Sequence, residues 1–240
     1  MLEAAPDAEA LRRLWVRGGF PGFLAASDGD SLTFRQNFIR TYLERDVPQL
    51  GPRIPAENAG TALDHARSRS GRAAQRIQTR LRPFDQRPDR NELHRLSNVR
   101  KRLVKSPKVY VRDGGLAHAL LGIGDYNAVA GHPVVGASWE GFVIENLLAA
   151  APRRTTASFY RTSAGAEIDL LLELPGNRGL WAIEIKRGLS AAPRKGFHSA
   201  RKDLNPKRSF LVYSGEERYP ISKDVEATGV RQMASLPAER

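Results

Sequence analysis

Cysteine is absent from the 240-residue sequence, and its absence excludes disulfide bonds, thiolate metal sites and cysteine nucleophiles. The five histidines are scattered and lack the spacing of metal ligands, so any metal ion would be held by carboxylates. No run of about 18 apolar residues occurs, and the first residues lack the basic-then-apolar order of a secretory signal. We therefore expect a cytoplasmic protein without a membrane-spanning helix.

Basic residues outnumber acidic ones: 38 Lys and Arg stand against 26 Asp and Glu, giving a net charge of +12. This excess favours an anionic partner such as DNA, although a basic surface without a particular partner gives the same count. Hydrophobic residues make up 41% of the chain, enough for one packed core. The length predicts a principal domain with a smaller appendage.

The pattern of residues divides the chain into three segments: 1–56, 57–98 and 99–240. In the first segment, Leu11, Leu14 and Trp15 have helical spacing, and the glycines from Gly18 onward predict the turn that ends this helix rather than a phosphate loop. A second helix is predicted from about Thr33 to Arg45. Its apolar stripe, which we expect to be buried, consists of Phe34, Phe38, Ile39, Tyr42 and Leu43.

The second segment, 57–98, contains nine Arg, no Lys, five acidic residues and only eleven hydrophobic residues, five of them Ala. Its large apolar side chains follow neither helical nor strand spacing over a useful length. Such a segment buries too little surface to offset the entropy of ordering it. We interpret it as a solvated connector in preference to an Arg-rich arm that binds nucleic-acid phosphates.

The third segment, 99–240, returns to regular patterns and predicts a mixed sheet flanked by helices, which is an α/β fold. Helices are expected at 113–121, from near Ser138 to Leu147, and at 195–204. Strands are expected at 108–111, 158–161, 166–173, 179–186 and 209–213.

Two of these strands carry charged residues in otherwise apolar surroundings. Glu167 and Asp169 alternate with Ile168, and Glu184 and Lys186 alternate with isoleucines, so each polar pair shares one face of its strand. Burying such charges costs several kcal/mol unless they are paired or bind a metal. A simple ion pair of Lys186 with one of the acids is the alternative to a functional site.

This combination of acids and a lysine is consistent with a divalent-metal site for phosphodiester cleavage. Asp169 and Glu184 would supply oxygen ligands to Mg²⁺, and Glu140 on the preceding helix would complete the metal shell. The ion lowers the pKa of a bound water and neutralises charge on the phosphate. Lys186 would orient this water or stabilise the developing charge. The catalytic candidates are therefore Asp169, Glu184 and Lys186.

These residues resemble the PD-(D/E)XK nuclease-like fold, in which a mixed sheet is flanked by helices. More specifically, four motifs are similar to the C-terminal domain of bacterial and archaeal AAA-type ATPase proteins, domain of unknown function 4143. The N-terminal LWVRGGFPGFLAA (14–26) and FIRTYLERDVP (38–48) are similar to the helical segment that follows the ATPase module in that family. The four motifs are RLVKSPKVYVRDGGLAHALLG (102–122), WEGFVIENLL (139–148), YRTSAGAEIDLLLE (160–173) and WAIEIKRG (181–188).

The chain departs from this family in two respects. It has no G-x-x-x-x-G-K-[ST] motif, so the ATPase module is missing and we expect no ATP binding. The family also has a winged-helix-like segment where this chain has its Arg-rich stretch. When plausible codons for Ala62 to Arg95 are read one nucleotide later, they give a peptide with a helix-turn-helix pattern that includes LNAS and TVTSYID. We therefore predict that about residues 58–98 are an out-of-frame translation.

Two functions follow from the resemblance. The first is a nuclease-like domain that cleaves DNA with Mg²⁺ at Glu140, Asp169, Glu184 and Lys186. The second is a non-catalytic regulatory module of a truncated ATPase-family protein that binds nucleic acid or a protein. Because one fold hosts many functions, the resemblance implies the fold more firmly than the reaction.

Overall fold

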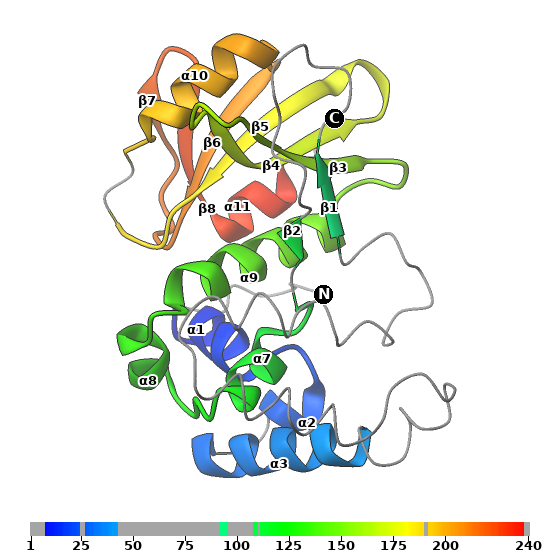
Figure 1. Cartoon of the computed structure of the whole chain (residues 1–240), viewed down its shortest axis with the longest axis vertical. Coiled ribbons are helices and arrows are strands. Elements are labelled where there is room, and N and C mark those ends of the chain that lie inside the picture. Colours follow the sequence, from blue (N-terminus) through cyan, green and yellow to red (C-terminus); the bar gives the residue numbers. More distant parts are fainter. Residues whose placement is uncertain are drawn as a thin grey trace. The chain divides into compact units, whose positions relative to one another are not determined.

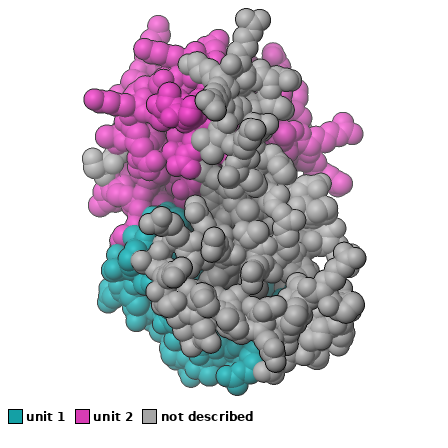
Figure 2. Space-filling model, viewed as in Figure 1, with its two compact units in different colours: residues 1–91, 109–138 teal, residues 92–108, 139–240 magenta. Residues whose placement is uncertain are grey.

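The computed structural model describes residues 8–24, 27–42, 92–95, 108–109, 111–189 and 192–237. The chain forms two compact units (Figure 2): unit 1 comprises Met1–Asn91 and Val109–Ser138, and unit 2 comprises Glu92–Lys108 and Trp139–Arg240. Residues 109–138, which the sequence analysis placed in the C-terminal domain, thus group with the N-terminal helices. Within the described residues, no helix has the length and apolar character needed to cross a bilayer.

Unit 1 is helical, and local capping residues set where its helices begin. Ser27 accepts a hydrogen bond from Asp30 N, while Asp113 and Asp125 cap two later helices in the same way. The first helix ends at Gly18, whose φ of +86° is a conformation that favours glycine. The helices are α1 (Ala8–Arg17), α2 (Pro21–Leu24), α3 (Asp28–Thr41), α7 (Gly114–Leu120) and α8 (Tyr126–Gly131).

The buried face of α3 is polar, which corrects the apolar stripe predicted from the sequence. Ser31 and Arg35 are its buried residues, whereas Phe34 is 52% exposed. Phe38, Ile39 and Tyr42 are only half-buried, and Leu43 lies outside the described residues. Phe34 and Phe38 contact Phe23 at the margin of the core, with ring centroids 5.5 and 5.7 Å away. Helical spacing alone did not reveal which side of this helix faces the core.

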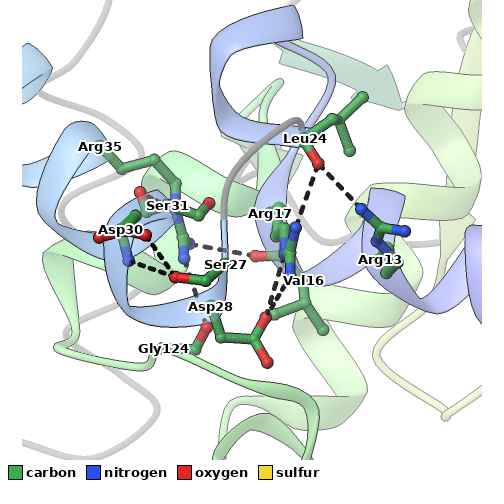
Figure 3. Close-up of polar contacts among 10 residues, drawn as sticks. All are labelled: Arg13, Val16, Arg17, Leu24, Ser27, Asp28, Asp30, Ser31, Arg35 and Gly124. Atoms are coloured by element: carbon green, nitrogen blue, oxygen red, sulfur yellow. Dashed lines mark hydrogen bonds and ion pairs between the residues drawn. The ribbon is translucent and has the colours of Figure 1, made fainter.

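Arg35 is fully buried because backbone carbonyls satisfy its guanidinium group (Figure 3). Its Nη1 donates to Val16 O at 3.1 Å and to Gly115 O at 2.9 Å, and its Nε donates to Ser31 O at 3.1 Å. The end of α1, the start of α7 and α3 are thereby joined by one side chain. Burial lowers the pKa of Arg35 from its ordinary value, and the nearby Asp113 carboxylate opposes this effect.

Unit 2 is built on a mixed sheet of eight described strands in the order β2-β1-β3-β4-β5-β6-β8-β7. The β3–β4 and β4–β5 pairs are antiparallel, whereas β5–β6 and β6–β8 are parallel. This architecture confirms the predicted α/β fold class, with N-terminal helices followed by a mixed sheet with flanking helices. The strands are β1 (Glu92–Arg95), β2 (Lys108–Val109), β3 (Thr156–Arg161), β4 (Glu167–Leu174), β5 (Gly179–Ile185), β6 (Arg208–Tyr213), β7 (Tyr219–Ser222) and β8 (Val225–Gly229).

Helices cover the sheet, with α10 (Lys195–Leu204) on one face and α11 (Val230–Ser235) on the other (Figure 1). Phe197 and Ala200 of α10 pack against Leu171 on β4 and Ala182 on β5. The boundary between the two units falls inside the long helix α9 (Val135–Ala150), and a short 3₁₀ turn, η3 (Gly176–Arg178), joins β4 to β5. The core of unit 2 thus includes the two strands that carry the candidate site.

Most elements of the third segment agree with the sequence analysis. The helix predicted at 195–204 has these bounds in the structure, and β3, β4, β5 and β6 begin or end within two residues of their predictions. Helix α9 begins at Val135 instead of near Ser138. The sequence analysis did not identify α8, β7, β8 or α11. The Arg-rich segment 57–98 lies outside the described residues except for β1, whose backbone pairs in parallel with β3.

Candidate active site at the end of strands β4 and β5

Asp169 and Glu184 are buried acids on neighbouring antiparallel strands, and each is only 3% exposed. The register pairs Leu170 with Ile183, so its extension by one residue places Asp169 opposite Glu184. Residues directly opposite in an antiparallel pair share one face of the sheet. Both acids therefore lie on the face that α10 covers, two residues beyond Leu171 and Ala182 of its core contact.

Glu184 is held by charge and by hydrogen bonds to its carboxylate. Lys186 Nζ lies 2.9 Å from Oε1, and the backbone N–H of Arg194 donates to both carboxylate oxygens at 3.2 Å. The Arg194 guanidinium Nε lies 3.5 Å from the same Oε1. These contacts offset the cost of burying the carboxylate.

Both backbone groups of Lys186, its N–H and its carbonyl, form hydrogen bonds. Its N–H donates to Val212 O on β6 at 2.8 Å, and its carbonyl accepts the indole N–H of Trp139 at 3.0 Å. Trp139 belongs to α9 and is itself 3% exposed. The lysine side chain is 20% exposed, so its charged end is accessible while its backbone is immobilised.

Asp169 supports the end of β5 through its side chain. Its Oδ2 accepts the backbone N–H of Ile185 at 2.9 Å, two residues beyond Ile183, the last residue of β5 that pairs with β4. The backbone group is thereby satisfied where the β4–β5 ladder stops. Asp169, Glu184 and Lys186 thus lie at one end of β4 and β5, and their catalytic roles stay predictions.

Glu140 lies on α9 and is half-buried. Among the described residues, no three His, Asp or Glu side chains form a group that could hold a metal ion. The three-carboxylate shell predicted from Glu140, Asp169 and Glu184 is therefore not assembled. Mg²⁺ keeps several waters and binds through one or two acidic side chains, so a site of Asp169 and Glu184 alone stays a prediction.

The other residues singled out in the sequence have structural environments. Arg161 pairs with Glu167 at 3.5 Å across the β3–β4 hairpin, and Trp139 and Phe142 are buried as expected of core residues. His198 is exposed on α10, whereas His118 is fully buried in unit 1. The Gly18 N–H donates to Leu14 O at 2.9 Å, which confirms the helix-ending turn.

The sequence analysis did not predict that Trp139 and Arg194 contact residues of the candidate site. Trp139 looked like an ordinary core residue, and only its indole bond to Lys186 connects it to the site. Arg194 contributes mainly its backbone N–H, a group that every residue except proline possesses. Nothing in the sequence pattern marks either contact, because both depend on segments that meet only in the fold.

Two family models match separate parts of the chain. Residues 135–233, which contain the candidate site, match the family described as Domain of unknown function (DUF4143). Residues 8–81 match Domain of unknown function (DUF8612), and this match continues into the Arg-rich segment. The DUF4143-like region thus covers the candidate site, in a chain of mixed α/β fold. Its likeness to the DUF4143 domain was expected from the motifs, whereas the nuclease-like and ATPase associations stay predictions.

The chain is also similar to two mycobacterial proteins: Uncharacterized protein Mb2031c of Mycobacterium bovis and Uncharacterized protein Rv2008c of Mycobacterium tuberculosis. Each is 41% identical to it over 241 aligned residues, covering 94% of this chain and 54% of the relative. The homology thus extends over most of the chain, while the chain spans about half the length of these relatives. No solved structure matches it.

Proposed function

We propose that unit 2 is a nuclease-like domain that cleaves phosphodiester bonds of DNA with the help of Mg²⁺. The observation that carries this proposal is the placement of Asp169, Glu184 and Lys186 at one end of two neighbouring strands. Two buried acids beside an accessible ammonium group suit a substrate that is itself an anion. Outside residues 57–98 the chain still has 29 Lys and Arg against 21 Asp and Glu, an excess consistent with such a substrate.

Each residue has a distinct role in this proposal. Asp169 and Glu184 would hold the ion, which when bound neutralises charge on the phosphate and lowers the pKa of a coordinated water. Lys186 would leave Glu184 Oε1 when the ion binds there, because the two cations share that oxygen. Its Nζ would then donate hydrogen bonds to a phosphate oxygen. In the cleavage, the water oxygen would bond to phosphorus and the phosphorus–oxygen bond to the leaving group would break. The water would lose a proton to solvent, and the leaving oxygen would take up a proton from solvent.

Nicking of supercoiled plasmid in Mg²⁺ or Mn²⁺ tests this function. The wild-type chain should convert the plasmid to its open-circular form, and the double variant Asp169→Ala, Glu184→Ala should not. Glu173→Ala with Asp224→Ala is a matched control, because it removes two exposed acids elsewhere in unit 2. Calorimetric titration with Mg²⁺ adds a readout that is independent of cleavage. Equal nicking by the wild type and the site variant would refute the assigned roles.

A non-catalytic binding module is the second candidate, and the neutralisation of Glu184 favours it. Lys186 and Arg194 already satisfy this carboxylate, and a third acid does not join the group among the described residues. Such a module would bind DNA in EDTA and leave the plasmid intact in both Mg²⁺ and Mn²⁺. Metal-dependent nicking that Asp169→Ala abolishes would exclude it.

A further inference from the structure

Helix α10 presents a basic face to solvent. Lys195, His198, Ser199 and Lys202 are exposed and follow one another at i, i+3, i+4 and i+7, which places them on one side of the helix. The opposite side, with Phe197 and Ala200, packs on the sheet. The helix is therefore amphipathic, and its polar side carries only positive or neutral groups.

The positive charges of this face are not balanced by nearby acids. No described acid forms an ion pair with Lys195 or Lys202. Asp203, the acid on α10, accepts a hydrogen bond from the buried Tyr160 hydroxyl at 2.9 Å. Arg201 turns instead toward Ser209 Oγ, 2.7 Å away, and toward Asp224. The outward charges of α10 are thus available to a ligand.

The basic face begins at the candidate active site. Arg194 precedes α10 and donates its backbone N–H to Glu184, so Lys195 follows immediately after that contact. With a rise of about 1.5 Å per residue, Lys195 and Lys202 are separated by about 10 Å along the helix axis. This distance corresponds to roughly three base pairs of duplex DNA at 3.4 Å each.

We propose that the outward face of α10 binds the phosphate backbone of duplex DNA and holds it across the Asp169–Glu184–Lys186 site. This inference rests on the proposed function for the identity of the site that the duplex crosses. An anionic membrane surface would also attract lysines. A helix that lies on a membrane needs an exposed apolar side, however, and the apolar side of α10 is occupied by the sheet.

Fluorescence anisotropy with a labelled 20-base-pair duplex tests the proposal in EDTA, where no metal-dependent cleavage occurs. The variant Lys195→Gln, Lys202→Gln should weaken binding roughly 50-fold at 0.1 M salt if both lysines contact phosphates. It should also reduce the slope of log K against log salt by about two. Lys195→Arg, Lys202→Arg keeps both charges and should restore wild-type binding. Arg40→Gln, Arg153→Gln removes two exposed cations elsewhere and should change affinity little.

The outcomes separate this inference from the proposed function. Binding that depends on the two lysines, without nicking in Mg²⁺ or Mn²⁺, would support the α10 surface and refute catalysis. Nicking and binding that are equal in the wild type and the glutamine variant would refute the surface alone. A wild-type chain that does not bind the duplex at low salt would also overturn the inference. The inference would likewise be overturned if the glutamine variant lost binding to phosphatidylserine vesicles while its binding to the duplex stayed unchanged.

Discussion

At the scale of single residues, buried side chains that bond to backbone carbonyls determine how the charged groups are placed. Trp139 is the clearest case in unit 2, because its indole N–H donates to the carbonyl of Lys186, the residue whose Nζ pairs with the Glu184 carboxylate. Arg35 has the same role in unit 1, where it bonds to carbonyls of separate helices. Both contacts join a buried side-chain donor to a backbone carbonyl of another segment of the chain.

Trp139→Phe should disturb Lys186 more than it disturbs the fold. The change removes the indole donor and leaves the Lys186 carbonyl without it, at a cost of about 1–3 kcal/mol in the free energy of unfolding. The Nζ resonance of Lys186 should shift in NMR spectra, and plasmid nicking should slow with little change in duplex affinity. Trp181→Phe is a matched control, because Trp181 is equally buried and donates to Arg178 O at 3.2 Å. An identical Lys186 spectrum in wild type and Trp139→Phe would contradict the positioning role.

His118 should make unit 1 sensitive to acid. Its Nδ1–H donates to Val16 O at 3.0 Å, so Nε2 accepts the hydroxyl proton of Ser138 at 2.6 Å. Burial, opposed by the Val16 bond, lowers the pKa of His118 to about 4, and Arg35 and His132 add to the lowering. The unfolded chain, with a pKa near 6.5, therefore takes up the proton first as the pH falls. Stability is complete above pH 6.5 and should be lost toward pH 4, by about 2 kcal/mol at pH 5.

Urea unfolding at pH 7.5, 6 and 5 measures this dependence. His118→Asn keeps a donor for Val16 O but does not titrate, so it should flatten the profile in this range. His198→Asn, at an exposed position, should keep the wild-type profile. Burial raises the pKa of Asp113, which by itself makes the folded state more stable at low pH, so the comparison with His118→Asn isolates the histidine. A wild-type profile that is already flat would contradict the prediction.

At the scale of elements, α10 connects the core of unit 2 to the candidate site. Its inner side packs on β4 and β5, the backbone N–H of Arg194 just before it donates to Glu184, and its outer side carries the lysines. The helix can approach the sheet this closely because residue 196 is glycine. A Cβ added to Gly196 would lie 2.5 Å from the carbonyl oxygen of Gly165.

Gly196→Ala should therefore destabilise the docking of α10, although alanine is the better helix former by about 1 kcal/mol. The clash is with backbone, which cannot rotate away, so the start of the helix must shift away from Gly165. We expect a lower melting temperature and faster hydrogen exchange at the Arg194 amide. Gly136→Ala in α9 has nothing within 4 Å of the new Cβ and should raise the melting temperature. Equal effects of the two substitutions would contradict this account.

The sequence predicted the elements of the sheet core well, because β4, β5 and β6 are largely apolar runs that are buried in the fold. The alternation of Glu184 and Lys186 with isoleucines placed these two residues on one face. Helical spacing failed to predict the buried face of α3, where an arginine faces the core and the predicted phenylalanine stripe does not. The spacing does not show which backbone carbonyls a guanidinium group will contact in the fold. The short elements β7 and α11 have four and six residues, too few to establish a period.

At the scale of the whole molecule, the main prediction is that part of the chain is translated from a shifted reading frame of its gene. We expect the nucleotide sequence, read one position later over about residues 58–98, to encode a helix-turn-helix peptide that includes LNAS and TVTSYID. The Arg excess of this segment would then reflect GC-rich codons and not selection for DNA binding. Sequencing the gene decides the question, and a shifted frame that encodes an unrelated peptide would end this interpretation. A protein with the frame restored should also have a larger helical signal in circular dichroism.

Unit 1 is assembled from two stretches of chain that lie on either side of residues 43–107. Arg35 reaches Gly115, and the Asp113 carboxylate accepts the Gly19 N–H at 2.8 Å while it also caps α7. These bonds hold the two parts of unit 1 together without any contribution from the residues between them. A single proteolytic cut between residues 43 and 107 should accordingly leave two fragments that elute together and separate only in denaturant. Because these bonds join residues 8–42 directly to residues 111–138, the sequence between them could change, even by a shift of reading frame, while the two parts of unit 1 stay bound to each other.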